Sequence, residues 1–267
     1  MTTIFDINAQ YYSQRRESLD DYRRLLDDPR VAGVVASGMD LRLDDSQAFS
    51  FMATTFRTTN EQFLEFAAEL RSPKLVPFCY VDPSQPDAAG RIEQYVRKDG
   101  FRGVKMYPPK GWYPDEDRVL DAFRAAESLS VPVFLHMGRT ASHPQLRSKY
   151  AQPIHLEGLG LACPRLKAII GHFAAPWSRE AAHLAMSFPF FFDLSTSGSW
   201  DRASIVYAAR NPFLGAARLL LGTNGNGRNN LALADETLQR LREYGLTEDE
   251  VNMAARTNAM RLLGLEV

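Results

Sequence analysis

Two histidines that end consecutive apolar runs are the residues of this sequence best placed to do chemistry. His136 closes the run VPVFLH, and His172 closes KAIIGH. Imidazole titrates near neutral pH, so either residue could act as a general acid or base or bind a metal ion. A lone histidine is more often a hydrogen-bonded core residue. Because neighbouring parallel strands end at the same edge, we predict that these two histidines share one site.

Polar side chains also stand at the ends of other apolar runs. They are Asp6, Asn8, Gln10, Lys105, Tyr107, Asp193, Ser195, Thr196, Asn224, Asn226 and Arg228. Lys105 and Tyr107 are two residues apart, so they share a strand face. Lys105 could hold a substrate carboxylate or pair with a buried acid. Arg139, just after His136, could bind an anionic substrate or be a solvated surface residue.

Short apolar runs alternate with amphipathic stretches along the chain. The predicted strands cover residues 3–7, 33–37, 75–81, 103–107, 132–136, 167–171, 190–194 and 219–222. The predicted helices cover residues 19–27, 60–70, 87–98, 117–129, 152–161, 179–188, 201–211 and 231–244. Parallel strands need crossover connections, and eight strand–helix units close naturally into a barrel. We predict an α/β fold, a single (β/α)₈ TIM barrel over residues 1–267, with an open doubly wound sheet as the alternative.

Three features extend this basic plan. Thr247 and Glu250 form a predicted capping box that opens one more C-terminal helix, which runs to about Leu263. Two connections, 38–59 and 137–151, exceed the usual few residues. Both follow strands, at the end where barrel enzymes build their active sites. We predict that they contact substrate, although connections that merely cover the barrel mouth would look the same.

Composition excludes several classes of protein. The chain has 267 residues, with 31 basic and 32 acidic side chains, which give a formal net charge of −1. This balance argues against a nucleic-acid partner, which would need clustered basic charge. The two cysteines, Cys79 and Cys163, have no metal-type spacing and favour a reducing compartment. With no signal peptide or membrane span in sight, the sequence predicts a cytoplasmic protein whose partner is a small-molecule substrate. Self-association into a homo-oligomer is left open.

Several segments follow one another in an order that matches a known family. They are GVKMYPPKGWYP, VPVFLHMG, QPIHLEGLGLACPRLKAIIGHFAAPW, FFFDLSTSG, LLGTNG and NAMRLLGL. Together they resemble the amidohydrolase superfamily, in its amidohydrolase-related (amidohydrolase 2) branch, from about Ile4 to Leu265. The resemblance implies a (β/α)₈ barrel. It also implies an enzyme such as a metal-dependent hydrolase or decarboxylase of small carboxylic or aromatic substrates, a hydratase, or a metal-free lactonase.

The sequence departs from this family at three metal-ligand positions. The family's first strand ends D-x-H-x-H, whereas Asn8 and Gln10 replace both histidines here. Its eighth strand ends G-T-D, whereas Asn224 replaces the carboxylate. Only His136 and His172 match. Because a zinc site needs three or four strong ligands and neutral amides are weak ones, we predict a polar pocket with no metal and no cofactor.

Four other residues carry side chains that could replace the missing ligands. His155 and His183 lie in predicted helices, which favours packing or solvent-facing roles. His143 lies in the long connection after His136 and could reach the site. Asp6 shares strand parity with Asn8, so we predict that it lies on the same face, one layer deeper.

The sequence therefore predicts a metal-independent enzyme of hydrolase or lyase type. Its substrate would be a carboxylated or aromatic small molecule, and the reaction would be ester or lactone hydrolysis, or a lyase, cyclisation or decarboxylation step. The predicted catalytic residues are His136, His172 and Asn224. The predicted substrate-binding residues are Asn8, Gln10, Lys105, Tyr107 and Arg139. A catalytically silent binding protein and a metal-dependent hydrolase with rearranged ligands are the alternatives.

Overall fold

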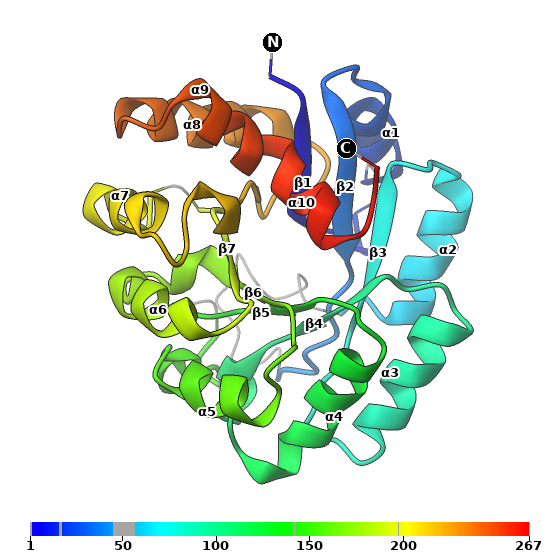
Figure 1. The fold of residues 1–267 in the computed structure, drawn as a ribbon. Helices are drawn as coiled ribbons and strands as arrows, with labels where there is room; N and C mark the ends of the chain where they lie inside the picture. Colours follow the sequence, from blue (N-terminus) through cyan, green and yellow to red (C-terminus); the bar gives the residue numbers. More distant parts are fainter. Residues whose placement is uncertain (1, 16–17, 45–56, 141–142, 197, 267) are drawn as a thin grey trace.

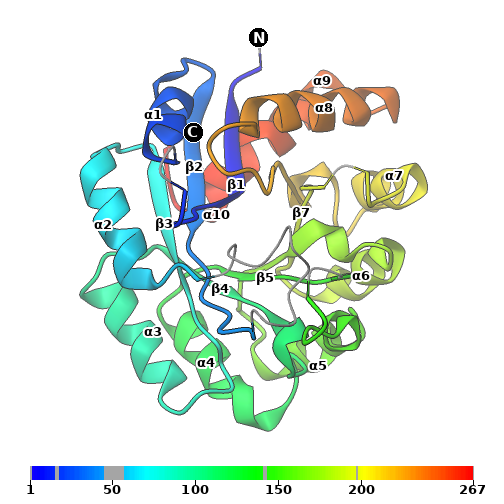
Figure 2. The ribbon, with the colours of Figure 1, turned by 180° about the vertical axis from the view of Figure 1, so that it is seen from behind.

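Eight parallel strands follow one another around a barrel (Figures 1 and 2). The computed structural model describes residues 2–15, 18–44, 57–140, 143–196 and 198–266. The strands are β1 (Ile4–Gln10), β2 (Val31–Ser37), β3 (Leu75–Tyr80), β4 (Gly103–Met106), β5 (Val133–Leu135), β6 (Ala168–Ile170), β7 (Phe191–Asp193) and β8 (Leu219–Leu220). The barrel closes just beyond β8, where the Gln10 N–H donates to Gly225 O at 2.7 Å and the Asn224 N–H to Asn8 O at 2.7 Å. The predicted TIM barrel is confirmed, and the open sheet is wrong.

Helices surround the strands on the outside (Figure 1). They are α1 (Ser18–Asp27), α2 (Asn60–Leu70), α3 (Ala88–Arg97), α4 (Asp117–Ser128), α5 (His155–Ala162), α6 (Ser178–Leu184), α7 (Arg202–Arg210) and α8 (Asn230–Glu243). Each lies at a predicted position, although α6 ends early and continues as a 3₁₀ turn, Ala185–Ser187. His155 and His183 fall on α5 and α6, as predicted. No helix in the described part of the chain is both long and apolar enough to cross a bilayer.

The predicted C-terminal helix is interrupted. Thr247 and Glu250 form the predicted capping box at the start of α9 (Glu248–Asn252). A π-helical turn, Met253–Thr257, then separates α9 from α10 (Asn258–Leu262). Within this turn the Ala254 carbonyl accepts a hydrogen bond from the Leu221 N–H at 2.8 Å, just after β8. A wider turn inside the helix thus gives one carbonyl to the barrel. The predicted extra C-terminal helix is confirmed from Glu248 to Leu262, with this π turn in its middle.

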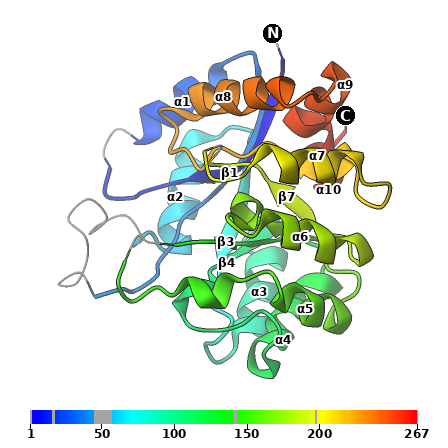
Figure 3. The ribbon, with the colours of Figure 1, turned by 90° about the vertical axis from the view of Figure 1, so that its left-hand side faces the viewer.

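The barrel interior is a closely packed apolar cluster. It combines strand residues with α10, and its members include Phe5, Ile7, Val35, Phe78, Phe134, Ile169, Leu220, Ala259 and Leu262. A second, larger cluster lies between the strands and the surrounding helices. The side view in Figure 3 places α10 at one end of the barrel and the described part of the connection after β5 at the other. The polar strand-end residues are found at this second end, the mouth.

The two long connections meet at the mouth. His143 Nε2 lies 3.1 Å from the Asp44 carbonyl oxygen, and the Asp44 N–H donates to Gln145 Oε1 at 2.7 Å. A small apolar cluster beneath them contains Met39, Leu41, Tyr80, Tyr107 and Leu146. Residues 45–56 and 141–142 of these connections lie outside the described part of the chain. Their contact with substrate stays a prediction.

Candidate active site

A chain of hydrogen bonds joins the ends of β5, β6 and β7. The Ser195 hydroxyl donates to Asp193 Oδ2 at 2.6 Å. Ser195 Oγ lies 2.7 Å from His172 Nδ1, and His172 Nε2 lies 3.0 Å from His136 Nδ1. The structure thus brings together the two histidines that the sequence assigned to one site. Asp193 and Ser195 complete the chain, although the sequence had marked them only as polar residues at a strand end.

The single hydroxyl proton of Ser195 sets the direction of this chain. The Ser195 hydroxyl uses its one hydrogen atom in the hydrogen bond to the Asp193 carboxylate. Ser195 Oγ must therefore accept the hydrogen bond from the Nδ1–H of His172. In a neutral His172, Nε2 then accepts from the Nδ1–H of His136. His136 Nε2 keeps its lone pair, and it is buried with no hydrogen-bond partner among the described residues. The chain therefore ends in a proton acceptor.

Burial favours the neutral form of both imidazoles. It lowers the pKa of His136 well below the ordinary value of 6.5, and His172 and Lys105 add to this shift. Burial also lowers the pKa of His172, although the carboxylate of Asp193 opposes this shift. At neutral pH, His136 is therefore unprotonated, so its free nitrogen can accept a proton although burial makes the imidazole a weaker base.

Asn8 links Lys105 to the carboxylate end of the chain. Lys105 Nζ donates to Asn8 Oδ1 at 3.0 Å. Asn8 Nδ2 in turn lies 3.2 Å from both Asp193 Oδ2 and Ser195 Oγ, and donates to them. Lys105 is only 3% exposed, and burial lowers its pKa to about 8 against the opposing effects of Asp193 and Asp6. A buried ammonium and a buried carboxylate are thus bridged by one amide.

Gln10, Asn224 and Tyr107 form three further contacts at the mouth. Gln10 Nε2 donates to Asn224 Oδ1 at 2.7 Å, across the seam between β1 and β8. The Tyr107 ring stacks on His136, with ring centroids 4.1 Å apart. Its hydroxyl lies 3.1 Å from Thr140 Oγ1. Tyr107 therefore forms one wall beside the histidine pair, and the two amides hold each other in place.

Strained backbone follows β6 where it supplies the site. His172, Phe173 and Ala174 have φ angles of 53°, 49° and 52°. This left-handed conformation costs a non-glycine residue roughly 1–2 kcal/mol. The His172 N–H donates to Asp193 Oδ2 at 3.0 Å, which helps to hold the turn. Position 222, just after β8, requires glycine, since a Cβ there would collide with the Asp193 carboxylate.

Two candidates from the sequence lie outside this network. The Arg139 side chain is exposed, and its backbone N–H donates to Ala175 O at 2.7 Å. Its proposed contact with substrate stays a prediction. His143 Nδ1 accepts from the Gln145 N–H at 3.1 Å while its Nε2 contacts Asp44, so both ring nitrogens are engaged within the long connections.

The predicted orientation of Asp6 is wrong. Its carboxylate accepts hydrogen bonds from the Thr223 hydroxyl at 2.6 Å and from Asn230 Nδ2, at the start of α8, at 2.8 Å. The pairing of β1 with β2 shifts register between Asp6 and Ala9. This irregularity breaks the strict alternation of side chains, so Asp6 turns toward α8 while Asn8 faces Lys105.

The residues at the mouth make a poor site for a divalent metal ion. In the described ranges, no group of three or more His, Cys, Asp or Glu side chains could hold one. Asn8 and the Gln10–Asn224 pair are hydrogen-bonded to other side chains. The Lys105 ammonium beside Asn8 would also repel a cation. Of the five positions where the resemblance places metal ligands, only His136 and His172 then carry strong donors, fewer than the three or four that zinc requires.

The comparison with family models assigns the chain. It belongs to the amidohydrolase family, whose model (Amidohydro_2) matches residues 8–265. Together, fold and family make it a barrel enzyme of hydrolase or lyase type. A comparison with curated protein sequences finds no match.

Solved structures with the same fold cover nearly the whole chain. An uncharacterised TIM-barrel protein from Bordetella bronchiseptica has a TM-score of 0.74 at 18% identity, with 98% of each chain covered. A dihydroxybenzoic acid decarboxylase from Polaromonas, with bound manganese and 2-nitroresorcinol, has a TM-score of 0.67 at 17% identity, with 99% of this chain and 97% of that chain covered. The 5-carboxyvanillate decarboxylase LigW from Sphingomonas paucimobilis has a TM-score of 0.67 at 14% identity, with both chains fully covered (100%). At these identities the likeness concerns the fold.

Proposed function

We propose that this protein is a metal-independent enzyme that uses the histidine pair for acid–base catalysis on a small carboxylated or aromatic substrate. The observation that carries the proposal is His136 Nε2, a buried lone pair that has no partner among the described residues and ends a directed hydrogen-bond chain. A buried polar atom without a partner is costly, and such atoms concentrate where a ligand completes them. The substrate, or a water molecule that attacks it, would supply the missing proton.

The other members of the chain support this proton transfer. When His136 takes up a proton at Nε2, its Nδ1–H points at His172, whose Nδ1–H points at Ser195 and through it at Asp193. The carboxylate at the far end then stabilises the positive charge. His172 and Ser195 fix the orientation of His136. The proton can be returned from Nε2 to the leaving group in the second half of the reaction.

The amides and the lysine would bind substrate. Asn224 and Gln10 can offer hydrogen bonds to a carbonyl or oxyanion, and Lys105 can attract an anion. The decarboxylases among the structural neighbours are a reason to test aromatic carboxylic acids first. Manganese in one of them favours a metal-dependent alternative, but the ligands that this chain provides argue against it.

The test is a substrate screen with matched histidine variants. Metal-stripped protein is assayed for CO₂ release from hydroxybenzoates and for hydrolysis of esters and lactones. We expect His136→Ala and His172→Ala each to lower the rate roughly 10²-fold or more, the scale of losing a general acid or base. His183→Ala, which removes an exposed imidazole on α6, should leave the rate unchanged. Near-normal rates in both site variants, or activity that requires added manganese or zinc, would contradict the proposal.

A further inference from the structure

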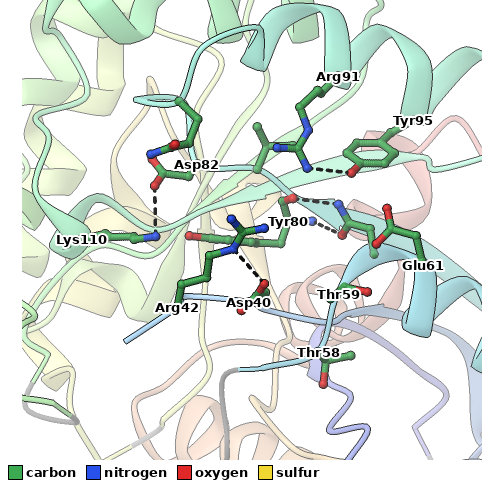
Figure 4. Close-up of a pocket in the computed structure, with 13 residues that line it drawn as sticks. Asp40, Arg42, Thr58, Thr59, Glu61, Tyr80, Asp82, Arg91, Tyr95 and Lys110 are labelled. Carbon is green, nitrogen blue, oxygen red and sulfur yellow. Dashed lines mark hydrogen bonds and ion pairs between the residues drawn. The ribbon is translucent and has the colours of Figure 1, made fainter. Parts of the chain in front are cut away.

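A hollow lies beside the mouth (Figure 4), and no residue of the histidine chain lines it. Its walls come from the connections after β2, β3 and β4, the end of β3, the first turn of α2, and α3. Its volume is about 160 Å³. An engineered cavity of about 150 Å³ holds benzene, so this space suits a molecule of similar size.

The walls of this hollow are held by hydrogen bonds within the protein. Asn60, at the start of α2, clamps the end of β3, since its Oδ1 accepts from the Tyr80 N–H at 2.8 Å and its Nδ2 donates to Tyr80 O at 2.9 Å. Asp82 Oδ1 accepts from the Ser84 hydroxyl at 2.7 Å, and Asp82 Oδ2 lies 3.2 Å from Lys110 Nζ. The site is therefore built before any ligand arrives.

One wall carries a polar atom without a partner. The Tyr80 hydroxyl is buried and makes no hydrogen bond within the part of the chain that the structure describes. Tyr80 is 8% exposed, and burial raises the pKa of its hydroxyl well above 10, an effect that Asp82 increases. The group therefore keeps its proton and can donate it. A buried donor of this kind calls for an acceptor from outside the protein.

The neighbouring cations have donors to spare. Arg42 uses Nε for Asp40 at 3.2 Å, and the paired N–H groups of its guanidinium have no hydrogen-bond partner among the residues that the structure describes. Lys110 uses one donor for Asp82. Figure 4 shows Arg42, Lys110 and Tyr80 around the same space. Two cations and a phenol together present more donors than the nearby acids take up.

We propose that this hollow is a binding site for a small organic carboxylate, held by the Tyr80 hydroxyl, Arg42 and Lys110. The acids Asp40 and Asp82 already pair with these cations, so a cationic ligand would find few free acceptors. A monoanion suits the walls better than phosphate, because Asp40, Asp82 and Glu61 would repel a second negative charge. The proposal stands independently of the proposed function, since no member of the histidine chain lines the hollow.

The experiment measures binding of benzoate to the full chain by calorimetry. Tyr80→Phe removes only the unpartnered hydroxyl, so the fold should be unaffected. We expect this variant and Arg42→Gln each to weaken benzoate binding roughly tenfold or more, as for loss of a hydrogen bond to a charged group. Tyr244→Phe, at the end of α8, is the matched control and should bind as the parent does.

Further measurements test the charge of the preferred ligand and distinguish the hollow from the histidine site at the mouth. Benzamide, which is neutral, and inorganic phosphate should both bind at least tenfold more weakly than benzoate. In a His136→Ala background, Tyr80→Phe and Arg42→Gln should still weaken benzoate binding by the same factors, because no histidine-chain residue lines the hollow. The proposal is overturned if benzoate does not bind, if Tyr80→Phe binds as tightly as the parent, if phosphate binds more tightly, or if the effect of Tyr80→Phe disappears in the His136→Ala background.

Discussion

At the scale of residues, one hydroxyl decides the protonation pattern of the site. The Ser195 hydroxyl has a single hydrogen atom, and it donates that hydrogen bond to the carboxylate of Asp193. Each imidazole that follows therefore donates through Nδ1, and the free lone pair falls on His136 Nε2 rather than on a nitrogen inside the chain. The tautomer of a histidine is set by the hydrogen bond that its other nitrogen makes. Ser195 is thus a positioning residue in the proposed reaction.

Ser195→Ala should expose this role. Without the hydroxyl, His172 Nδ1 loses its acceptor and the tautomer of His136 is no longer fixed. We expect kcat to fall roughly 10–10²-fold with KM little changed, while Ser195→Thr retains more activity because it keeps the hydroxyl. Nitrogen NMR of the imidazoles should show an Nδ1–H tautomer for His136 in the parent and a mixture in the alanine variant. A folded alanine variant with parental kcat and tautomer would contradict this role.

Lys105 allows a test of the electrostatics. Burial lowers the pKa of Lys105 from 10.5 to about 8. At neutral pH, where the group is charged, this shift corresponds to a destabilisation of the folded state by about 3 kcal/mol. Between about pH 8 and 10.5 the unfolded chain binds more protons at this group than the folded chain does. Stability contributed by this group therefore rises with pH across that window.

We accordingly expect the parent protein to gain up to about 3 kcal/mol relative to Lys105→Met as the pH rises from 7 toward 10.5. Denaturant unfolding of both proteins at each pH measures the difference, and groups common to both cancel. A constant difference across this pH range would show that the Lys105 ammonium is not desolvated in the folded protein.

The sequence indicated part of this residue-scale arrangement. His136 and His172 were predictable because strand ends in a barrel converge. The roles of Asp193 and Ser195 were not, since they depend on contacts to residues 21 and 23 positions away in the chain. Residue type and local pattern carry no information on such pairings. A polar pair ending an apolar run, FFDLS, was the available signal.

At the scale of elements, Asp6 fastens β1 to the far end of the chain. Its carboxylate accepts from the Thr223 N–H at 3.0 Å and from the Thr223 hydroxyl, just after β8, and from Asn230 on α8. These bonds reinforce the barrel seam on which Asn8 and Asn224 stand. The sequence misplaced Asp6 because alternation assumes a regular strand, and an irregular register leaves no mark in residue types. The π turn before α10 could not be predicted either, because a local widening of a helix also leaves no mark in residue types.

Removing the Asp6 carboxylate should loosen this seam. Asp6→Ala leaves several buried donors without an acceptor, each costing about 1–3 kcal/mol, so we expect the free energy of unfolding to fall by about 3 kcal/mol or more. Asp235→Ala removes an exposed carboxylate of α8 that pairs with Arg30, and should cost less than about 1 kcal/mol. Urea denaturation measures both. Equal, small losses in the two variants would mean that Asp6 does not fasten the seam.

At the scale of the whole molecule, the chain has the barrel architecture of its family but not the metal-ligand side chains that the resemblance implies for the mouth. The eight strand–helix units were predictable because each apolar run and each amphipathic stretch is clear on its own. Closure of the sheet then brings residues 8, 10, 136, 172 and 224 to one end. The chain belongs to the amidohydrolase family, yet amides stand at three positions where the resemblance places metal ligands. The scaffold should therefore accept those ligands again.

The triple variant Asn8→His, Gln10→His and Asn224→Asp tests this directly. With His136 and His172 it would present four imidazoles and a carboxylate at the mouth, enough for a zinc or manganese site. We expect about one equivalent of metal by elemental analysis. We also expect a rise in unfolding free energy of about 2.7 kcal/mol when free metal is at a hundred times its Kd. The parent and the three single variants should bind well under one equivalent, because each remains short of ligands. If the triple variant folds but binds no metal, these side chains do not converge on one point, and the correspondence of the three amides with the family's ligands is wrong.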